Sequence, residues 1–295
     1  MNEALVPDEL ALLLAEIPPL RPTSIVDVGA NPVHLPPYDL LRKLNACHVV
    51  GFEPQPEAFA ALERARQPNE TYFNLAIGDN TTHDLHIYRA EGMTSIFRPN
   101  LPGLRSVGME RFGKVLRSVP MQTVALDSID DLPAFDLLKI DIQGCEKLAF
   151  QGARRVLGTA IAVIVELRYL RLYEGEPMLG GVDEELLQQG FGLHKFLFNT
   201  AKMMHHSQAD RVRQRAMRDQ LIDGDAVYLR SLAEPQALTD DQLKHLAILA
   251  SCVFLSQSVV IYCLDELVRR GAASDSLPHR YVDALPAHFR KEPAP

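Results

Sequence analysis

Short apolar runs alternate with helical patterns along most of the chain. Seven runs have the length and composition of strands, at Ser24–Val28, His48–Glu53, Tyr72–Ile77, Leu137–Asp141, Ala162–Glu166, Leu193–Phe198 and Ala226–Leu229. Apolar residues at helical spacing predict helices at Tyr38–Leu44, Glu57–Arg66, Lys147–Leu157 and Asp183–Gln189. Several strands are apolar almost throughout, as is typical of strands covered on both faces. The alternation predicts an α/β fold with a doubly wound, mostly parallel seven-stranded sheet.

This alternation is interrupted twice. Between Thr81 and Leu126 two extended segments flank a long insertion, and insertions of this length are often functional. Beyond the last strand, Thr239 is suited to begin a helix and Gly271 to end it, so we predict one long helix between them. The predicted parts are an N-terminal helical extension (1–21), a main domain (22–231) and a C-terminal helical appendage (232–295).

The predicted C-terminal helix is apolar on two faces. Besides its main stripe it carries Ile248, Leu255, Val259 and Tyr262. Burial of the helix on two sides would explain this pattern. One of the two faces could be buried in a homodimer formed through the helix. The segment Leu246–Leu264 approaches the length of a membrane span, but serines and a glutamine interrupt it, so we predict no span.

Composition narrows the function classes. The formal net charge is −8 and no long basic block is present, which argues against a nucleic-acid partner. The four cysteines form no CxxC pair, and reduced thiols of this kind are typical of a cytoplasmic protein. The first ten residues are acidic and do not have the basic start of a secretory signal.

Carboxylates stand at the ends of four predicted strands. Asp27 comes just before the turn at Gly29, and Glu53, Asp141 and Glu166 end three later strands. Ligands of open α/β sheets bind beyond the carboxyl ends of the strands. We therefore expect these acids to line a ligand site.

The first turn favours a cofactor without phosphates. The turn holds Gly29, Ala30 and Asn31, followed by Pro32, so the GxGxxG pattern of dinucleotide folds is missing. A carboxylate at Asp27 would repel a pyrophosphate, whereas S-adenosylmethionine carries an ammonium and a sulfonium. The same features argue against the alternative of an NAD-dependent oxidoreductase.

Glu53 is predicted to bind a ribose. It follows Gly29 by 24 residues, the spacing at which an acid meets the ribose hydroxyls in nucleotide-binding sheets. Pro54 then stiffens the chain before the next helix. Ala76 and Ile77, at the end of the third predicted strand, are expected to pack against an adenine ring.

An ordered set of motifs resembles the FkbM family of methyltransferases. In chain order they are "VDVGAN", "GFEPQPEAF", "NLAIGDN", "TVALDSI" and "LLKIDIQGCEKLAFQGA", and the match covers about Pro22 to Ser231. The resemblance implies a class I, Rossmann-like methyltransferase fold, S-adenosylmethionine as donor and usually a hydroxyl acceptor. The predicted cofactor contacts are Asp27, Gly29, Ala30, Asn31, Glu53, Pro54, Ala76, Ile77 and Asp141.

Two departures from the family bear on the chemistry. Pro32 replaces a frequent glycine, and Gln143 stands where the family often has an acid. A neutral glutamine disfavours a divalent cation, so no metal ligands are predicted. The catalytic candidates are Asp141 as base or cofactor anchor, Lys139 as an orienting cation, and Glu166 and His205 as further bases. In the insertion, Thr94 and Ser95 are expected to close over the site.

These observations predict an O-methyltransferase that acts on a hydroxyl of a small molecule or glycan. The alternative is a catalytically silent scaffold that binds an adenosine cofactor and works through its C-terminal helix.

Overall fold

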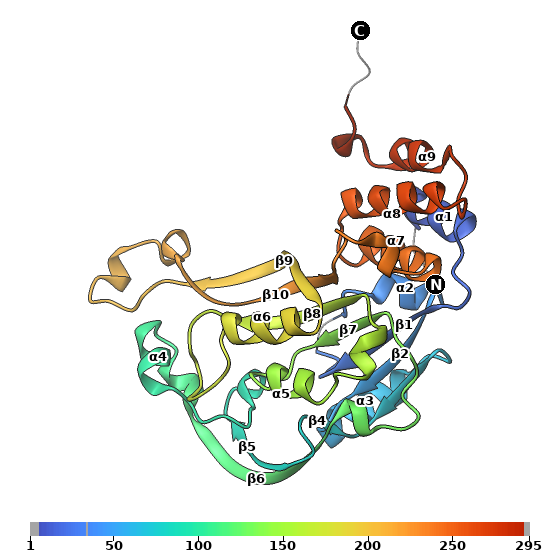
Figure 1. Cartoon of the computed structure of the whole chain (residues 1–295). Coiled ribbons are helices and arrows are strands. Elements are labelled where there is room, and N and C mark those ends of the chain that lie inside the picture. Colours follow the sequence, from blue (N-terminus) through green and yellow to red (C-terminus); the bar gives the residue numbers. More distant parts are fainter. Residues whose placement is uncertain (1–5, 34, 292–295) are drawn as a thin grey trace.

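The computed structural model describes residues 6–33 and 35–291 and shows a central sheet between two layers of helices (Figure 1). The sheet has seven strands in the order β3-β2-β1-β7-β8-β10-β9. Their bounds are β1 Thr23–Val28, β2 Cys47–Phe52, β3 Glu70–Phe73, β7 Leu137–Ile140, β8 Ala162–Arg168, β9 Phe191–Lys202 and β10 Gln220–Arg230. Only β10 runs antiparallel, to both of its neighbours. The predicted fold class is confirmed.

The strand order places a switch point in the middle of the sheet. From β1 the chain moves outward through β2 to β3, and it then returns to β7 on the other side of β1. Connections that leave adjacent strands in opposite directions open a crevice at the carboxyl ends of those strands. The acids that end β1, β2 and β7 are therefore brought to one edge.

Alternate residues of the strands point into two separate cores. Ile25, Ile164 and Val227 pack against one group of helices, α1 Asp8–Glu16, α2 Asp39–Lys43, α7 Asp240–Cys252, α8 Gln257–Arg269 and α9 Leu277–Ala284. Val26 and Val163 pack on the opposite face, against α5 Glu146–Gln151 and α6 Leu179–Gln188. A further helix, α3 Pro56–Ala65, follows β2 and contacts β3. Strands apolar on both faces are explained by this double cover.

The predicted strand Tyr72–Ile77 is in fact two short strands in different sheets. β3 belongs to the main sheet, whereas β4 Ala76–Ile77 joins a three-stranded sheet with β5 Thr82–Tyr88 and β6 Val115–Val124. Asn74 lies between them, and its side-chain amide donates to the carbonyl of Glu53 at 2.8 Å. The two extended segments of the insertion are confirmed as β5 and β6, which enclose a short helix, α4 Leu101–Ser106.

The prediction of one long C-terminal helix is wrong. The chain breaks between α7 and α8, where Leu255 adopts a left-handed φ of 52°. The break is held from outside the helices, because Lys195 Nζ of β9 donates to the carbonyl of Phe254 at 2.9 Å. The predicted ends are correct: Thr239 caps α7 together with Gln242, and Gly271, with a φ of 71°, follows α8.

The C-terminal helices form a layer of the main core. Leu246, Leu249 and Leu264 share one buried cluster with the sheet residues Ile25 and Val49. This buried cluster contains residues from both sides of the predicted boundary at residue 231. The division of the chain into three parts and the homodimer through the C-terminal helix remain predictions. The first five residues of the expected N-terminal extension lie outside the described residues. None of the described helices combines the length and hydrophobicity needed to cross a membrane.

Candidate active site

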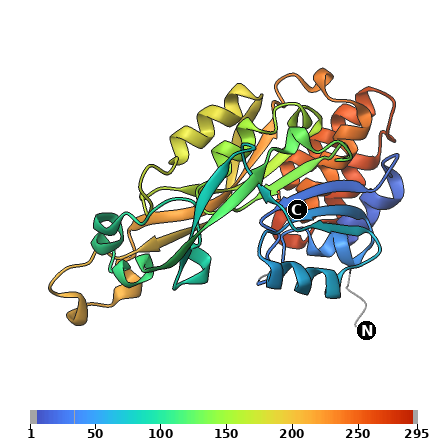
Figure 2. The ribbon, with the colours of Figure 1, turned by 90° about the horizontal axis from the view of Figure 1, so that it is seen from below.

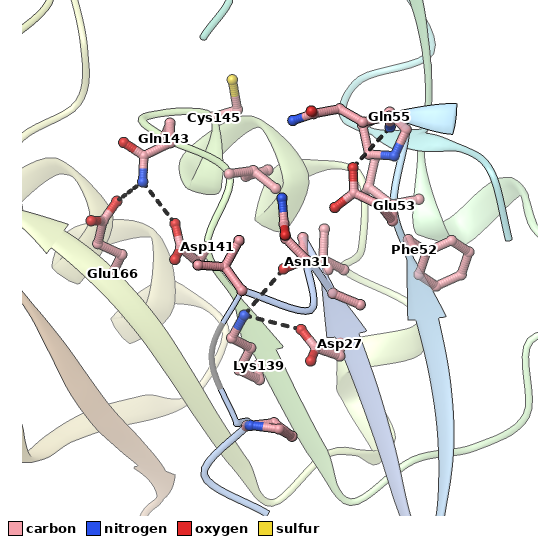
Figure 3. A pocket seen from close by; sticks show the side chains of 18 of the residues that line it. Asp27, Asn31, Phe52, Glu53, Gln55, Lys139, Asp141, Gln143, Cys145 and Glu166 are labelled. Carbon is pink, nitrogen blue, oxygen red and sulfur yellow. Dashed lines mark hydrogen bonds and ion pairs between the residues drawn. The ribbon is translucent and has the colours of Figure 1, made fainter. Parts of the chain in front are cut away.

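A cavity of about 1120 Å³ lies at the carboxyl ends of the central strands (Figure 3). All predicted site residues except His205 line it, namely Asp27, Gly29, Ala30, Asn31, Glu53, Pro54, Ala76, Ile77, Lys139, Asp141 and Glu166. The topology explains this convergence for the residues at the carboxyl ends of β1, β2, β7 and β8. Ala76 and Ile77 come from β4 of the three-stranded sheet.

Asp27 is paired within the protein. It is the register partner of Lys139 on the neighbouring strand, and Lys139 Nζ lies 3.1 Å from Asp27 Oδ1. The hydroxyl of Tyr38 donates to the other oxygen at 2.5 Å. Burial alone would lower the pKa of Lys139, but the nearby carboxylates of Asp27 and Asp141 outweigh it and raise that pKa. The negative charge that Asp27 offers to a ligand is thus partly balanced by Lys139.

Only glycine fits at position 29. Its φ is 80°, and a Cβ there would lie 2.1 Å from the carbonyl oxygen of Asp141. The first turn therefore packs directly against the end of β7. Lys139 Nζ also donates to the carbonyl of Gly29, at 3.3 Å, and so ties the same two segments together.

Glu53 presents a buried carboxylate to the cavity. Its residue is 2% exposed, and Oε1 accepts from the backbone N–H of Gln55 at 2.8 Å. The second oxygen has no hydrogen-bond partner among the described residues and remains available to a ligand. Burial raises the pKa of this carboxyl group. A ligand that donates hydrogen bonds would relieve the cost of burying it.

Three carboxylates gather beyond β7 and β8. Oxygens of Asp141, Glu146 and Glu166 lie within 4.8 Å of one another. The side-chain amide of Gln143 lies between two of them, and its Nε2 donates to Asp141 at 2.9 Å and to Glu166 at 3.1 Å (Figure 3). Glu146 is committed to the turn, where it accepts from the backbone N–H groups of Ile142 and Gly144.

Arg168 fixes the orientation of that amide. It is buried, and its Nη2 donates to Gln143 Oε1 at 3.4 Å and to Glu166 at 3.0 Å. A guanidinium can only donate, so the amide oxygen must face Arg168 and the NH₂ group must face the carboxylates. The sequence prediction missed Arg168. The available signal was its position two residues after Glu166, which places both on one face of β8.

The comparison with protein families decides the assignment. The family model described as "Methyltransferase FkbM domain" matches residues 27–193, which is more than half of the chain. The chain belongs to the FkbM methyltransferase family. No curated protein matches the sequence. The match begins at Asp27 and includes the cavity residues of β1, β2, β7 and β8.

Solved methyltransferase structures are similar to the chain at low identity. Magnesium protoporphyrin IX methyltransferase from Synechocystis PCC 6803 is 12% identical, with 75% of this chain and 76% of that chain covered and a TM-score of 0.37. 1,6-didemethyltoxoflavin-N1-methyltransferase from Burkholderia thailandensis is also 12% identical, with 78% and 80% covered and a TM-score of 0.36. Membership of the family depends on the family model and not on these similarities.

The fold does not bring His205, which lies outside the matched domain, to the cavity. His205 is exposed, and its backbone N–H donates to the carbonyl of Ser106 at the end of α4. The β9–β10 hairpin and α4 extend away from the sheet together (Figures 1 and 2). Thr94 and Ser95 do line the cavity, and the hydroxyl of Ser95 donates to the carbonyl of Gln143 at 2.7 Å.

The carboxylate cluster could supply oxygen ligands to a divalent cation, but the amide of Gln143 opposes one. Its NH₂ group points at Asp141 and Glu166, and Arg168 prevents the flip that would present the amide oxygen instead. A cation between these carboxylates would have to displace two hydrogen bonds. The donor set therefore fits a bridging amide better than a metal ion.

We expect a chelator to leave activity unchanged within about twofold, because no step proposed below needs a cation. The matched variant is Gln143→Glu, which replaces the NH₂ group with a further carboxylate. Mn²⁺ should raise the melting temperature of this variant and not that of the unmodified protein. Loss of methyl transfer on chelation, restored by a divalent cation, would show that the amide does not exclude the metal.

Asp225 is a second residue that sequence reasoning missed. It is the register partner of Glu166 and lines the cavity. Burial, with the negative charge of Asp141 nearby, raises the pKa of Asp225 to about 6. Burial also raises the pKa of Glu146 to about 7 and that of Glu166 well above its ordinary value. Of these three groups, Glu166 most strongly favours the protonated form near neutral pH.

These shifts predict a pH-dependent stability. A raised pKa in the folded state means that the stability contributed by Asp225 is complete below about pH 4 and is lost as the pH rises through about 6. Asp225→Asn should remove this loss, so the variant should gain on the order of 1 kcal/mol over the unmodified protein between pH 4 and 8, after allowance for partial exposure. Urea unfolding at several pH values measures the difference. A constant difference across this range would contradict the shift.

Proposed function

We propose that the protein is an S-adenosylmethionine-dependent O-methyltransferase that acts on the hydroxyl of a small molecule or glycan. The observation that carries the proposal is the buried carboxylate of Glu53, whose second oxygen is available within the cavity that also holds Asp141 and Glu166. One cavity thus offers a ribose acceptor and a proton acceptor. Membership of the FkbM family supports methyl transfer as the chemistry.

The charges around the cavity favour a positively charged cofactor. Its lining carries the acids Asp27, Glu53, Glu70, Asp141, Glu166 and Asp225. The arginine and the lysine of the lining already form ion pairs within the protein. Arg42 pairs with Asp39 and Glu70, and Lys139 pairs with Asp27. A diphosphate would be repelled by this surplus of carboxylates, whereas an ammonium or sulfonium would be attracted.

Each part of the lining fits one part of the cofactor. The turn Gly29–Asn31 would lie against the amino-acid part of the cofactor. Glu53 would accept hydrogen bonds from the ribose hydroxyls, and Ala76 and Ile77 would pack against the adenine. Pro54 would hold the chain beside the ribose. When bound, the cofactor would supply a methyl group on a sulfonium, and its sulfur would leave as the neutral thioether of S-adenosylhomocysteine as the carbon–sulfur bond breaks.

The protein's task is then to position the acceptor and to remove its proton. Asp141 lies beyond β7, and its Oδ1 is held by Gln143. As the new carbon–oxygen bond forms, the hydroxyl proton would pass to Oδ2 of Asp141. Lys139, held by Asp27 and Gly29, would stabilise the negative charge of Asp141. Glu166 is the second candidate base, but its raised pKa favours the protonated form and makes it the weaker candidate near neutral pH.

Calorimetry tests the cofactor assignment. We expect S-adenosylhomocysteine to bind with a Kd in the micromolar range and NAD to show no binding at the same concentrations. Tight NAD binding would overturn the proposal. Formation of S-adenosylhomocysteine with candidate acceptors then separates an active enzyme from a silent scaffold, because both would bind the cofactor. Localisation in the cytoplasm and the absence of a nucleic-acid partner remain predictions.

A further inference from the structure

Four exposed apolar side chains line the same cavity. Val33, Leu35, Phe198 and Leu255 are 70%, 72%, 54% and 65% exposed. They come from three distant segments, namely the loop after β1, strand β9 and the break between α7 and α8. A single exposed leucine is ordinary, but several that converge on one cavity mark a binding surface. We call these four residues the apolar wall.

The strand register places Phe198 of the apolar wall beside the acids of the cavity. Phe198 is the register partner of Asp225, and Asp225 is the register partner of Glu166. Cross-strand partners project from the same face of a sheet, so the ring of Phe198 lies next to Asp225 on the face that carries Glu166. Leu197 and Val253, which are less exposed, line the cavity nearby. Through Phe198 the apolar wall therefore reaches the acids near the proposed site of proton transfer, within the same cavity.

Leu255 occupies a backbone conformation that glycine would adopt without strain. Its φ is 52°, and bulky side chains rarely take this conformation. Backbone contacts impose it, because the N–H of Ser256 donates to the carbonyl of Ala250 and Lys195 Nζ lies 3.5 Å from the carbonyl of Leu255. The fold thus holds the exposed apolar side chain of Leu255 in the lining of the cavity.

The size of the cavity allows a second ligand beside the cofactor. Pockets for one drug-sized ligand measure about 300–1,000 Å³, and this cavity reaches about 1120 Å³. The cofactor proposed above would fill the part between Gly29 and Ile77. The part lined by the apolar wall remains for the acceptor.

We propose that the apolar wall binds the body of the methyl acceptor, so that the acceptor is a hydrophobic molecule with a hydroxyl group and not a glycan. This inference rests on the proposed function and narrows its substrate class. A glycan would need hydrogen-bond partners along its length, whereas the four side chains of the apolar wall offer none. The C-terminal layer contributes Leu255 and thereby takes part in substrate selection.

A fluorescent probe tests the apolar wall directly. N-phenyl-1-naphthylamine is neutral and apolar, and its emission rises in an apolar site. With the protein saturated by S-adenosylhomocysteine, the probe should bind, and Leu255→Gly should weaken its binding about tenfold through lost apolar contact. Glycine suits the left-handed backbone, so this variant should fold at least as well as the unmodified protein. The matched control is Leu221→Ala, an exposed leucine of β10 outside the cavity, which should bind the probe unchanged.

Three results would overturn the inference. Equal probe affinity in Leu255→Gly and the unmodified protein would remove the apolar wall from binding. Displacement of the probe by S-adenosylhomocysteine would place the probe in the cofactor's part of the cavity. Probe binding lost on dimer formation at high protein concentration would assign the apolar wall to a second copy of the chain. The proposed function fails separately, if S-adenosylhomocysteine does not bind in calorimetry while the probe still does.

Discussion

Glu53→Ala is expected to weaken the binding of S-adenosylhomocysteine about a hundredfold. The carboxylate is buried at the end of β2, where one oxygen is held by Gln55 and the other has no hydrogen-bond partner among residues 6–33 and 35–291. Two hydrogen bonds from ribose hydroxyls to a charged acceptor contribute about 3 kcal/mol together, which corresponds to about two factors of ten in Kd. Calorimetric titration of the variant measures the loss.

Two further variants make this result specific. Glu53→Gln keeps one oxygen acceptor and loses the charge, so its affinity should lie between those of the unmodified protein and the alanine variant. Glu63→Ala removes a carboxylate from α3 outside the cavity and should leave binding unchanged. An alanine variant at position 53 that binds as tightly as the unmodified protein would show that the ribose lies elsewhere.

The second large effect is expected for the proton acceptor. Asp141→Asn should lower kcat by a factor of about 10² to 10⁴, the range over which general bases contribute to catalysis. The asparagine keeps the shape of the side chain, and its amide oxygen can still accept from Gln143 Nε2. It cannot take up the hydroxyl proton of the acceptor. Affinity for S-adenosylhomocysteine should fall far less than kcat does.

Comparing the loss of kcat with the loss of affinity for S-adenosylhomocysteine distinguishes a catalytic role of Asp141 from a role in holding the cofactor. If affinity falls as much as kcat, then Asp141 anchors the cofactor and Glu166 becomes the leading base. Asp84→Asn, which changes an exposed acid of β5 outside the cavity, is the matched control and should retain full activity. Near-normal turnover in Asp141→Asn would exclude Asp141 from the chemistry.

The sheet was predictable because its physical signal is local. Strands such as "SIVDV" and "AVIVEL" are apolar on both faces, and this pattern alone indicates cover on both sides. The break at Leu255 was not predictable in the same way. The apolar stripe continues through it, and the contacts that hold it open come from Lys195, sixty residues earlier on β9. A left-handed leucine leaves no trace in hydrophobic periodicity.

The site was predictable as far as it follows from strand ends. Asp27, Glu53, Asp141 and Glu166 converge because parallel strands end at the same edge. Asp225 was missed because its importance lies in its cross-strand partner Glu166, which only the sheet register reveals. Arg168 follows Glu166 by two residues on the same strand, but its ion pairs with Glu176 and Asp223 depend on the fold. His205 was expected near the cavity from its place in a loop, but β9 and β10 continue beyond the sheet and carry the loop away from it.

A crystal structure with S-adenosylhomocysteine tests the central claim most directly. We predict the ribose hydroxyls on the carboxylate of Glu53, the adenine against Ala76 and Ile77, and the sulfur facing Asp141 with the apolar wall beyond it. A ligand bound outside this cavity, or one whose ribose makes no contact with Glu53, would contradict the account.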